Sequence, residues 1–443
     1  YRAGNPRRVV TETQVPLRAT VLVQGEFVTD AGTNIHGGKV GYDLRIHAYA
    51  GQPYVKLAFT LRNDGWYGYR NEGKNHPRQW LFLDSLRLEL PAKPFADCKV
   101  EANLCGQSLA PPNGKTASIA QWHMYPVRSS RNKKELLFDD EAARENKSGM
   151  EESEQGMYWR LEAGEASRGA PGKLPGWAEL SGPRGLRMGM AVRRFWQNFP
   201  RGFSLDSSRA SLSFLMFPED GFWPRTQAAH DAGAYQFEGG RHKTAEMLVW
   251  FGDPGRPPAE MLQIVEQPLF ARAPLEWYRD TGAVLPLAPP AAKTTDAELT
   301  EAMARYDRLQ RAKVIRECGD PAGPRYPFKN DDWDRTSIPD LQERAADVFS
   351  GWMNHGDLIW GFGYCSLYYQ WPYSMLQQYL RLGDRAFLDV AEDMIRHRYD
   401  IDQYHVENTE LHLGGFQRAE RGEHGHLSRQ EDIQGRNLHW EAN

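Results

Sequence analysis

Hydrophobic and polar residues alternate with a period of two along much of the first 280 positions. Val40, Tyr42, Leu44, Ile46 and Ala48 would share one strand face, with charged residues between them. A turn at 51–53 and a second alternating run at 55–61 predict a hairpin with one polar face. Comparable runs lie at 17–27, 80–90, 185–195, 211–217 and 245–251. Many short strands separated by turn residues predict an antiparallel β-sandwich.

The hydrophobic period becomes helical after a stretch rich in proline and alanine. Thr295-Asp-Ala-Glu298 matches a capping box, and helices are expected from 295 and at 258–270, 339–353, 366–382 and 385–397. Gly383 can end one helix and Asp384 can cap the next, which predicts an αα-hairpin. The expected organisation is a β region at 1–281, a linker at 282–294 and a helical domain at 295–443. A charged segment, 129–155, is expected to be an exposed insertion.

Charge, hydropathy and cysteine content argue against nucleic-acid binding, a membrane span and a structural zinc site. The 54 basic and 58 acidic side chains give a net charge of -4, and no long basic block is present, which argues against nucleic-acid binding. No apolar run approaches the roughly 20 residues that span a bilayer. Cys98 and Cys105 lie close enough in sequence to close a small disulfide loop, and the lack of a CxxC pair argues against structural zinc. A secreted or periplasmic location is expected.

Aromatic residues make up 12% of the chain, including 14 tryptophans. Such a content indicates either sugar binding, through indole faces stacked on sugar rings, or a large β core that buries the indoles. The densest aromatic stretch, 352–373, would line a sugar cleft or fill the space between helices. The candidate substrate-binding residues, with one arginine further along, are His355, Asp357, Trp360, Tyr364, Tyr368, Trp371 and Arg421.

Five of the 13 histidines fall within 397–426, among acids, arginines and a glycine pair. His405 is the candidate general base and Tyr404 the candidate acid, because a phenol and an imidazole can exchange protons near neutral pH. His412 and His424 are alternative bases. Arg418, with Arg421, could clamp a carboxylate through two parallel hydrogen bonds.

Each of these candidates also has an ordinary structural interpretation. The arginines alternate with glutamates, as on a solvated surface, and His397 would sit at a helix C-terminus, where the helix dipole favours a positive charge. The spacing of acids and imidazoles would suit calcium or zinc, but no metal ligand is assigned. Upstream, Arg241, His242 and Lys243 precede a strand and would either contact an acidic substrate or form a basic turn.

Several segments together resemble one enzyme family. They are Phe195-Trp-Gln-Asn-Phe-Pro200, Gly240-Arg-His-Lys-Thr244 before a strand ending Phe251-Gly-Asp, Gln378-Tyr-Leu-Arg-Leu-Gly-Asp384, and the run from His397 to Gly414-Gly415 and His424. As a set they look like exo-acting rhamnogalacturonan lyases and their YetA-like bacterial relatives. The resemblance implies a barrel-like β domain, a β-sandwich and an α/α toroid. Too few helical hairpins fit between 339 and 443 for a complete toroid, so an incomplete one is expected.

The resemblance implies a polysaccharide lyase acting on a uronate-containing glycan by β-elimination, with an acidic polysaccharide or oligosaccharide as partner. Calcium is the cofactor considered, and no oligomeric state is predicted. Two alternatives remain from the residues alone. One is a carbohydrate-binding or surface-assembly protein without activity. The other is a glycoside hydrolase that uses two carboxylates, drawn from Asp357, Asp400, Asp402, Glu407 and Glu410.

Overall fold

The structure is a computed structural model of the 443-residue chain. It describes residues 1–65, 70–71, 74–75, 81–95, 101–109, 116–124, 156–207, 211–219, 235–237, 239–284, 287–288, 290, 296–317, 351–353, 355–356, 371–403, 405–406, 416–420 and 423–428. The described chain is mostly antiparallel β-sheet, followed by helices towards the C-terminus. This order confirms the predicted sequence of β region and then α region.

The chain divides into two compact units. Unit 1 contains Tyr1–Pro126, Phe138–Pro268 and Tyr404–Leu413, and unit 2 contains Val127–Leu137, Leu269–Gln403 and Gly414–Asn443. The stretch expected to link two domains, 282–294, therefore lies within unit 2, where Leu287 is buried in the core. The expected insertion at 129–155 and the helix expected at 339–353 lie almost wholly outside the described residues.

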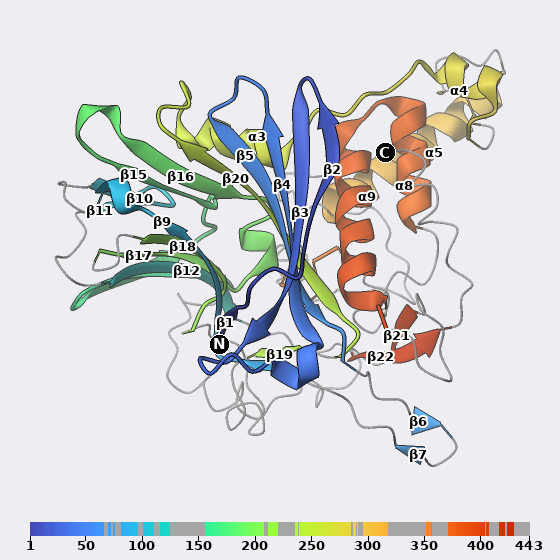
Figure 1. The fold of residues 1–443 in the computed structure, drawn as a ribbon. Coiled ribbons are helices and arrows are strands. Elements are labelled where there is room, and N and C mark those ends of the chain that lie inside the picture. Colours follow the sequence, from blue (N-terminus) through green and yellow to red (C-terminus); the bar gives the residue numbers. More distant parts are fainter. Residues whose placement is uncertain are drawn as a thin grey trace. The chain divides into compact units, whose positions relative to one another are not determined.

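Unit 1 is built on a 10-stranded antiparallel sheet (Figure 1). Its strand order is β1-β3-β4-β5-β20-β16-β15-β10-β11, and β2 also pairs with β3. The strands are β1 Arg2–Ala3, β2 Arg8–Val15, β3 Arg18–Val28, β4 Val40–Tyr49, β5 Tyr54–Asn63, β10 Glu101–Leu104, β11 Gln107–Leu109, β15 Trp177–Ser181, β16 Arg187–Val192 and β20 His242–Phe251. The predicted hairpin is β4–β5.

The register of the central strands separates an apolar face from a polar one. Tyr42 is the partner of Leu61, and both are buried. The neighbouring positions point the other way: Asp43 is the partner of Thr60, which in turn faces Thr244. Because side chains alternate along a strand, the face that holds Tyr42 and Leu61 is buried, and the opposite face carries polar groups at this end of the sheet but the buried Leu248 and Trp250 further along β20.

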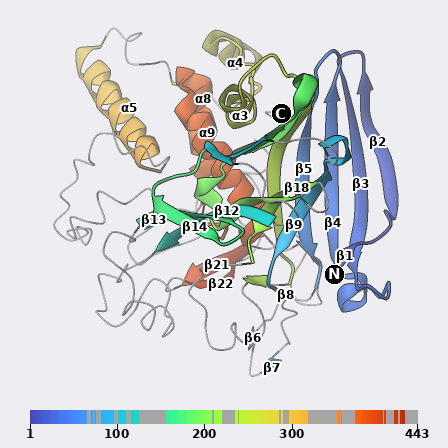
Figure 2. The same ribbon diagram turned by 90° about the vertical axis from the view of Figure 1, so that its left-hand side faces the viewer.

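A 6-stranded antiparallel sheet forms the second layer of unit 1 (Figure 2). Phe203 on this sheet is fully buried and stacks on Phe195, which follows β16 of the first sheet, with 5.0 Å between ring centroids. The two sheets therefore share a core, as a β-sandwich does. In the order of the sheet its strands are β14 Ala166–Pro171, β13 Gly156–Ala163, β12 Thr116–Met124, β17 Arg201–Asp206, β18 Ser211–Phe217 and β9 Leu86–Pro91.

Two short strand pairs complete the described β-structure of unit 1. They are β8 Leu81–Leu83 with β19 Tyr235–Phe237, and β6 Arg70–Asn71 with β7 Lys74–Asn75. The single strand expected at 80–90 is therefore two strands, β8 and β9. Cys105 is a free, buried thiol, so the expected disulfide to Cys98 is wrong. Burial raises the pKa of the Cys105 thiol to about 12.

Helix α3, Pro258–Glu266, covers one end of the large sheet. Its Met261 and Val265 pack with Leu248 and Trp250 of β20. Trp250 is fully buried, and its indole Nε1 donates a hydrogen bond to Glu179 Oε2 at 3.1 Å. On the neighbouring strand the partner of Trp250 is Gly189, where a Cβ atom would lie 2.1 Å from the indole. Glycine at 189 therefore makes room for the indole.

Unit 2 contains the predicted αα-hairpin, formed by α8, Trp371–Leu382, and α9, Arg385–His397. Gly383 has φ +72°, and the Asp384 side chain accepts a hydrogen bond from the Ala386 amide, as predicted. The other described helices of unit 2 are α4, Leu275–Thr281, and α5, Ala297–Glu317. Helix α5 is capped by Asp296, whose carboxylate accepts from the Leu299 amide at 2.9 Å. The expected capping residue, Thr295, lies outside the described residues.

Candidate acid–base site

The end of β5 and the beginning of β20 are held together by Asn63, which is almost fully buried. Its side-chain amide donates to the Phe237 carbonyl at 2.9 Å, and its carbonyl oxygen accepts from the Gly65 amide at 3.1 Å. The Asn63 backbone pairs with Gly240 and Arg241. These bonds fix the turn before β20 against the residues that follow β5.

Asp64, His242 and His405 meet at this end of the sheet. His242 Nε2 lies 2.9 Å from Asp64 Oδ1. The rings of His242 and His405 are stacked, with centroids 3.7 Å apart and planes at 6°. The His405 amide donates to the Gly240 carbonyl at 2.9 Å, which fixes the backbone as well as the ring. The His242 side chain is 17% exposed and the Asp64 side chain 28%, so both groups are accessible.

Arg62 connects this group to a second carboxylate. It is the cross-strand partner of His242, its guanidinium is paired with Asp64, and its Nε lies 2.9 Å from Asp43 Oδ1. Gly41 faces Arg62 on β4, and a Cβ atom there would lie 2.7 Å from the guanidinium. The small residue lets the arginine lie across the strand. Arg62 thereby holds Asp64 in position beside His242.

The pKa of the Asp64 carboxyl is lowered from its ordinary value. Burial acts in the opposite direction and raises it, but the hydrogen bond to His242 and the positive charges of His242, Arg62 and His405 outweigh burial. Asp64 is therefore a carboxylate at neutral pH. A carboxylate bonded to one imidazole nitrogen fixes the ring and its tautomer, and the other nitrogen is left to accept a proton.

Replacing Asp64 by asparagine should give a pH-dependent loss of stability. Because the folded-state pKa is lowered, the contribution of Asp64 is present above about pH 4 and is lost as pH falls through the folded-state value. The difference in melting temperature between wild type and Asp64→Asn should be largest near neutral pH and should shrink as pH falls below the ordinary pKa of an aspartate. The control is Asp30→Asn, an exposed aspartate. A difference that stays constant over this pH range would contradict the assignment.

The structure describes few of the other predicted site residues. Arg418 lies in β21, Phe416–Glu420, and His424 in β22, Glu423–Ser428, so this part of the expected loop is an antiparallel strand pair. Trp371 begins α8. The side chains of these three residues are not described. The remaining candidates outside the described residues are Tyr404, His412, Arg421, Asp357, Trp360, Tyr364 and Tyr368.

Unit 2 buries the acids and imidazoles at the end of α9. His397, the last residue of α9, is 1% exposed, and its Nε2 lies 3.3 Å from Asp402 Oδ1. Asp400 and Asp402 belong to a π-helical turn, Arg398–Asp402, and both are buried. His355, expected to bind a sugar hydroxyl, has its Nε2 3.4 Å from Asp393 Oδ2. These groups are engaged with one another inside unit 2.

The sequence pattern does not predict a site at His242 and Asp64. The sequence leaves open whether Arg241, His242 and Lys243 contact an acidic substrate or form a basic turn; in the structure Arg241 and Lys243 are buried and His242 alone of the three is partly exposed. Asp64 had no distinguishing signal, because it gains its role only from the pairing of β5 with β20. An alternating polar pattern at His242, Thr244 and Glu246 was the available sign of a polar sheet face.

The described residues contain no group of three His, Cys, Asp or Glu side chains arranged to hold a metal ion. Within the same part of the chain, no helix has the length and apolar character needed to cross a membrane.

Comparisons with known proteins give only distant likenesses. No family model and no curated protein matches the sequence. Among solved structures, a candidate aldose 1-epimerase from Klebsiella pneumoniae subsp. pneumoniae MGH 78578 has 10% identity and a TM-score of 0.25, over 58% of this chain and 56% of that one. A protein from Synechocystis sp. PCC 6803 has 12% identity and a TM-score of 0.23, over 55% and 65%.

A third solved structure is a galactose mutarotase related enzyme from Lactobacillus acidophilus. It has 9% identity and a TM-score of 0.21, over 56% of this chain and 71% of that one. The chain thus spans less than two thirds of the length of the first two structures. Likenesses of this size carry no argument about the reaction.

Proposed function

We propose that the chain acts as a polysaccharide lyase that cleaves a uronate-containing glycan, of the rhamnogalacturonan kind, by β-elimination. The observation that carries the proposal is the stacked pair His242 and His405, with Asp64 bonded to His242. The acid–base part of the proposal rests on this geometry. The substrate class rests on the family resemblance of the sequence and on its aromatic content.

The imidazole pair is suited to take up a single proton. The Asp64 carboxylate lies where it would stabilise a positive charge that forms on the His242 ring when a proton is taken up. A neutral imidazole beside a charge-stabilising partner is the usual form of a general base at neutral pH.

In the proposed reaction the imidazole pair removes the proton on the carbon next to the uronate carboxylate. A carbon–carbon double bond forms, the bond to the glycosidic oxygen breaks, and an acid protonates that oxygen. The substrate carboxylate must be neutralised for the proton to leave. Arg62 already pairs with Asp43 and Asp64, so its charge is engaged. Arg418 and Arg421, or a cation such as calcium, are the proposed neutralising groups, and Tyr404 is the proposed acid.

The remaining parts of the proposal follow the resemblance. Helices α8 and α9 would belong to an α/α toroid. Trp360, Tyr364, Tyr368 and Trp371 would line the sugar-binding surface with His355 and Asp357. The enzyme would act outside the cytoplasm, where polysaccharide substrates are found.

The proposal is tested by incubating the protein with rhamnogalacturonan and recording ultraviolet absorbance. Elimination produces an unsaturated uronate that absorbs, whereas hydrolysis does not. The matched control is the same polysaccharide with its carboxyl groups reduced to alcohols, which cannot undergo this elimination. Absorbance that rises with the native glycan and not with the reduced one is the expected result.

Other outcomes would replace the proposal. New reducing ends without absorbance would indicate a hydrolase. Asp400 and Asp402 are too buried to reach a glycosidic bond, and the other acids considered for that role lie outside the described residues. Binding without any turnover, unchanged in His405→Ala, would indicate a carbohydrate-binding protein.

A further inference from the structure

A row of polar side chains crosses three strands of the large sheet and ends at the candidate acid–base site. Gln24 on β3 and Asp43 on β4 are cross-strand partners, and Gln24 Nε2 donates to Asp43 Oδ1 at 3.1 Å. Arg62 on β5 has its Nε 2.9 Å from the same oxygen, and its Nη1 donates to the Asp64 carboxylate. Asp64 is in turn bonded to His242. The row therefore connects the imidazole to residues two and three strands away.

Gly41 leaves the space through which Arg62 reaches Asp43. Arg62 and Gly41 are cross-strand partners, and Asp43 lies two positions further along β4, so the arginine crosses to it diagonally. A Cβ atom at 41 would lie 2.7 Å from Arg62 Nη2 and 2.7 Å from the Gly25 carbonyl oxygen. The backbone of Gly41 is not left-handed. The close approach of the guanidinium and of β3 is therefore what requires a glycine here.

The contact between Arg62 and Asp43 is an ion pair of two largely shielded groups. Their side chains are 21% and 18% exposed. Arg62 Nε makes no aligned hydrogen bond among the described residues, so its attraction to Asp43 is electrostatic. Water and salt screen a partly buried pair less than one on an open surface. Asp43 therefore holds the guanidinium mainly through its charge.

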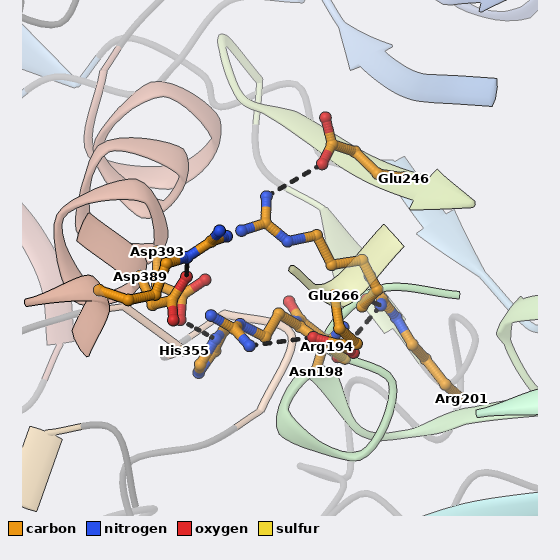
Figure 3. Close-up of polar contacts among 10 residues, drawn as sticks. Arg194, Asn198, Arg201, Glu246, Glu266, His355, Asp389 and Asp393 are labelled. Carbon is orange, nitrogen blue, oxygen red and sulfur yellow. Dashed lines mark hydrogen bonds and ion pairs between the residues drawn. The ribbon is translucent and has the colours of Figure 1, made fainter. Parts of the chain in front are cut away.

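Asp43 and Asp64 share one arginine, whereas a third acid of the same sheet has two cations of its own. Glu246 on β20 lies 3.3 Å from Lys56 Nζ and 3.1 Å from Arg193 Nη1 (Figure 3). Two carboxylates around a single guanidinium leave one formal negative charge in excess. The shared arginine thus positions Asp64 without neutralising it, and the carboxylate can still stabilise a positive charge on the neighbouring imidazole.

We propose that Asp43 is a positioning residue of the acid–base site. Through Arg62 it holds the Asp64 carboxylate against His242 Nε2 and preserves the negative charge of that carboxylate. A carboxylate in this place keeps a proton on Nε2, so the imidazole accepts the next proton at Nδ1. The source of that proton, the carbon next to a uronate carboxylate, rests on the proposed function, whereas the role of Asp43 towards the imidazole does not.

The first measurement needs no substrate. In the full chain labelled with nitrogen-15 at histidine, NMR follows the exchange with water of the His242 Nε2 proton, which is identified by its loss in His242→Ala. Asp43→Asn keeps the size of the side chain and an acceptor for Gln24 but removes the charge. Exchange should become about tenfold faster, because the bond to Asp64 is weakened. Asp43→Glu retains the charge and should exchange at nearly the parental rate.

The second measurement is the elimination rate on rhamnogalacturonan. Asp43→Asn should lower kcat about tenfold and change KM by less than about twofold, because Asp43 acts on the base and not on the substrate. Glu12→Gln is the matched control for both measurements. It removes a carboxylate that is paired with another arginine of the same sheet, Arg45, at 2.9 Å. The control should leave the proton exchange and the rate unchanged.

The outcomes separate this inference from the proposed function. Parental exchange in a folded Asp43→Asn protein would overturn the positioning role, even if the melting temperature were lower, since Asp43 would then be structural. Equal effects of Asp43→Asn and Asp43→Glu would overturn it as well, because packing and not charge would be responsible. Faster exchange in Asp43→Asn of a protein without elimination activity would support the positioning role and count against the lyase.

Discussion

Replacing His242 by alanine should lower the rate of β-elimination by about 10²- to 10⁴-fold, the usual contribution of a positioned general base. The substitution removes the ring that is bonded to Asp64 and stacked on His405. His405→Ala should have an effect of similar size, because the pair acts as one proton acceptor. The two losses should not add in the double variant, since removal of either ring already breaks the pair. The measurement is the initial rate of ultraviolet absorbance increase on rhamnogalacturonan.

His47→Ala is the matched control for this experiment. His47 lies on β4, on the polar face of the same sheet, and its Nδ1 is 3.0 Å from the Thr20 hydroxyl. It has no contact with the imidazole pair among the contacts of the described residues, so its removal should leave kcat/KM within about twofold. Equal activity in wild type and His242→Ala would refute the assignment of the acid–base site, whatever the substrate.

Replacing Trp250 by alanine should lower the free energy of unfolding by about 3 to 5 kcal/mol. The fully buried indole leaves a cavity against α3, and Glu179 loses a hydrogen-bond donor while remaining paired with Arg187. For a unit of this size the melting temperature should fall by roughly 6 to 20 °C. Thermal unfolding followed by circular dichroism measures the change.

Phe251→Ala provides the comparison at the next position of β20. Phe251 points to the other side of the strand and is 54% exposed. Its removal should change the free energy of unfolding by less than about 1 kcal/mol. Comparable losses in the two variants would mean that the indole is not the centre of the cluster on α3.

Much of the β-structure was predictable because each strand carries its own signal. Alternation in 40–48 predicts the strand, and the first part of its apolar face, Val40 and Tyr42, is buried, whereas Ala48 at the other end is exposed. The Gly383–Asp384 pair predicts the boundary between α8 and α9. The structure differs from the prediction at the end of one helix and in the expected linker, where the sequence pattern carries no strong signal. Helix α3 ends at Glu266 rather than 270, and the expected linker holds a core residue, Leu287, whose burial depends on its packing with α8 and α9.

Of the three residues in the candidate acid–base site, the sequence predicts only His405. The clustering of histidines along the sequence predicts His405 as a site residue. Its partners, His242 and Asp64, come from two different strand ends, and the register that joins them is a long-range pairing with no local signature. For Asp400 and Asp402 the sequence suggests a functional role that their buried position does not support. Their spacing indicated reactive chemistry, but the π-helical turn places them in the interior of unit 2.

Unit 1 is assembled from three separate segments of the chain, so a protein cut between them would lose part of the candidate site. His405 belongs to unit 1, although the residues on both sides of Tyr404–Leu413 belong to unit 2. A polypeptide ending at Pro268 would carry Asp64 and His242 but not the second ring. Two separately produced fragments, one ending there and one starting at Leu269, would each be inert, and mixing them should restore turnover only if the downstream fragment contributes its histidine in trans.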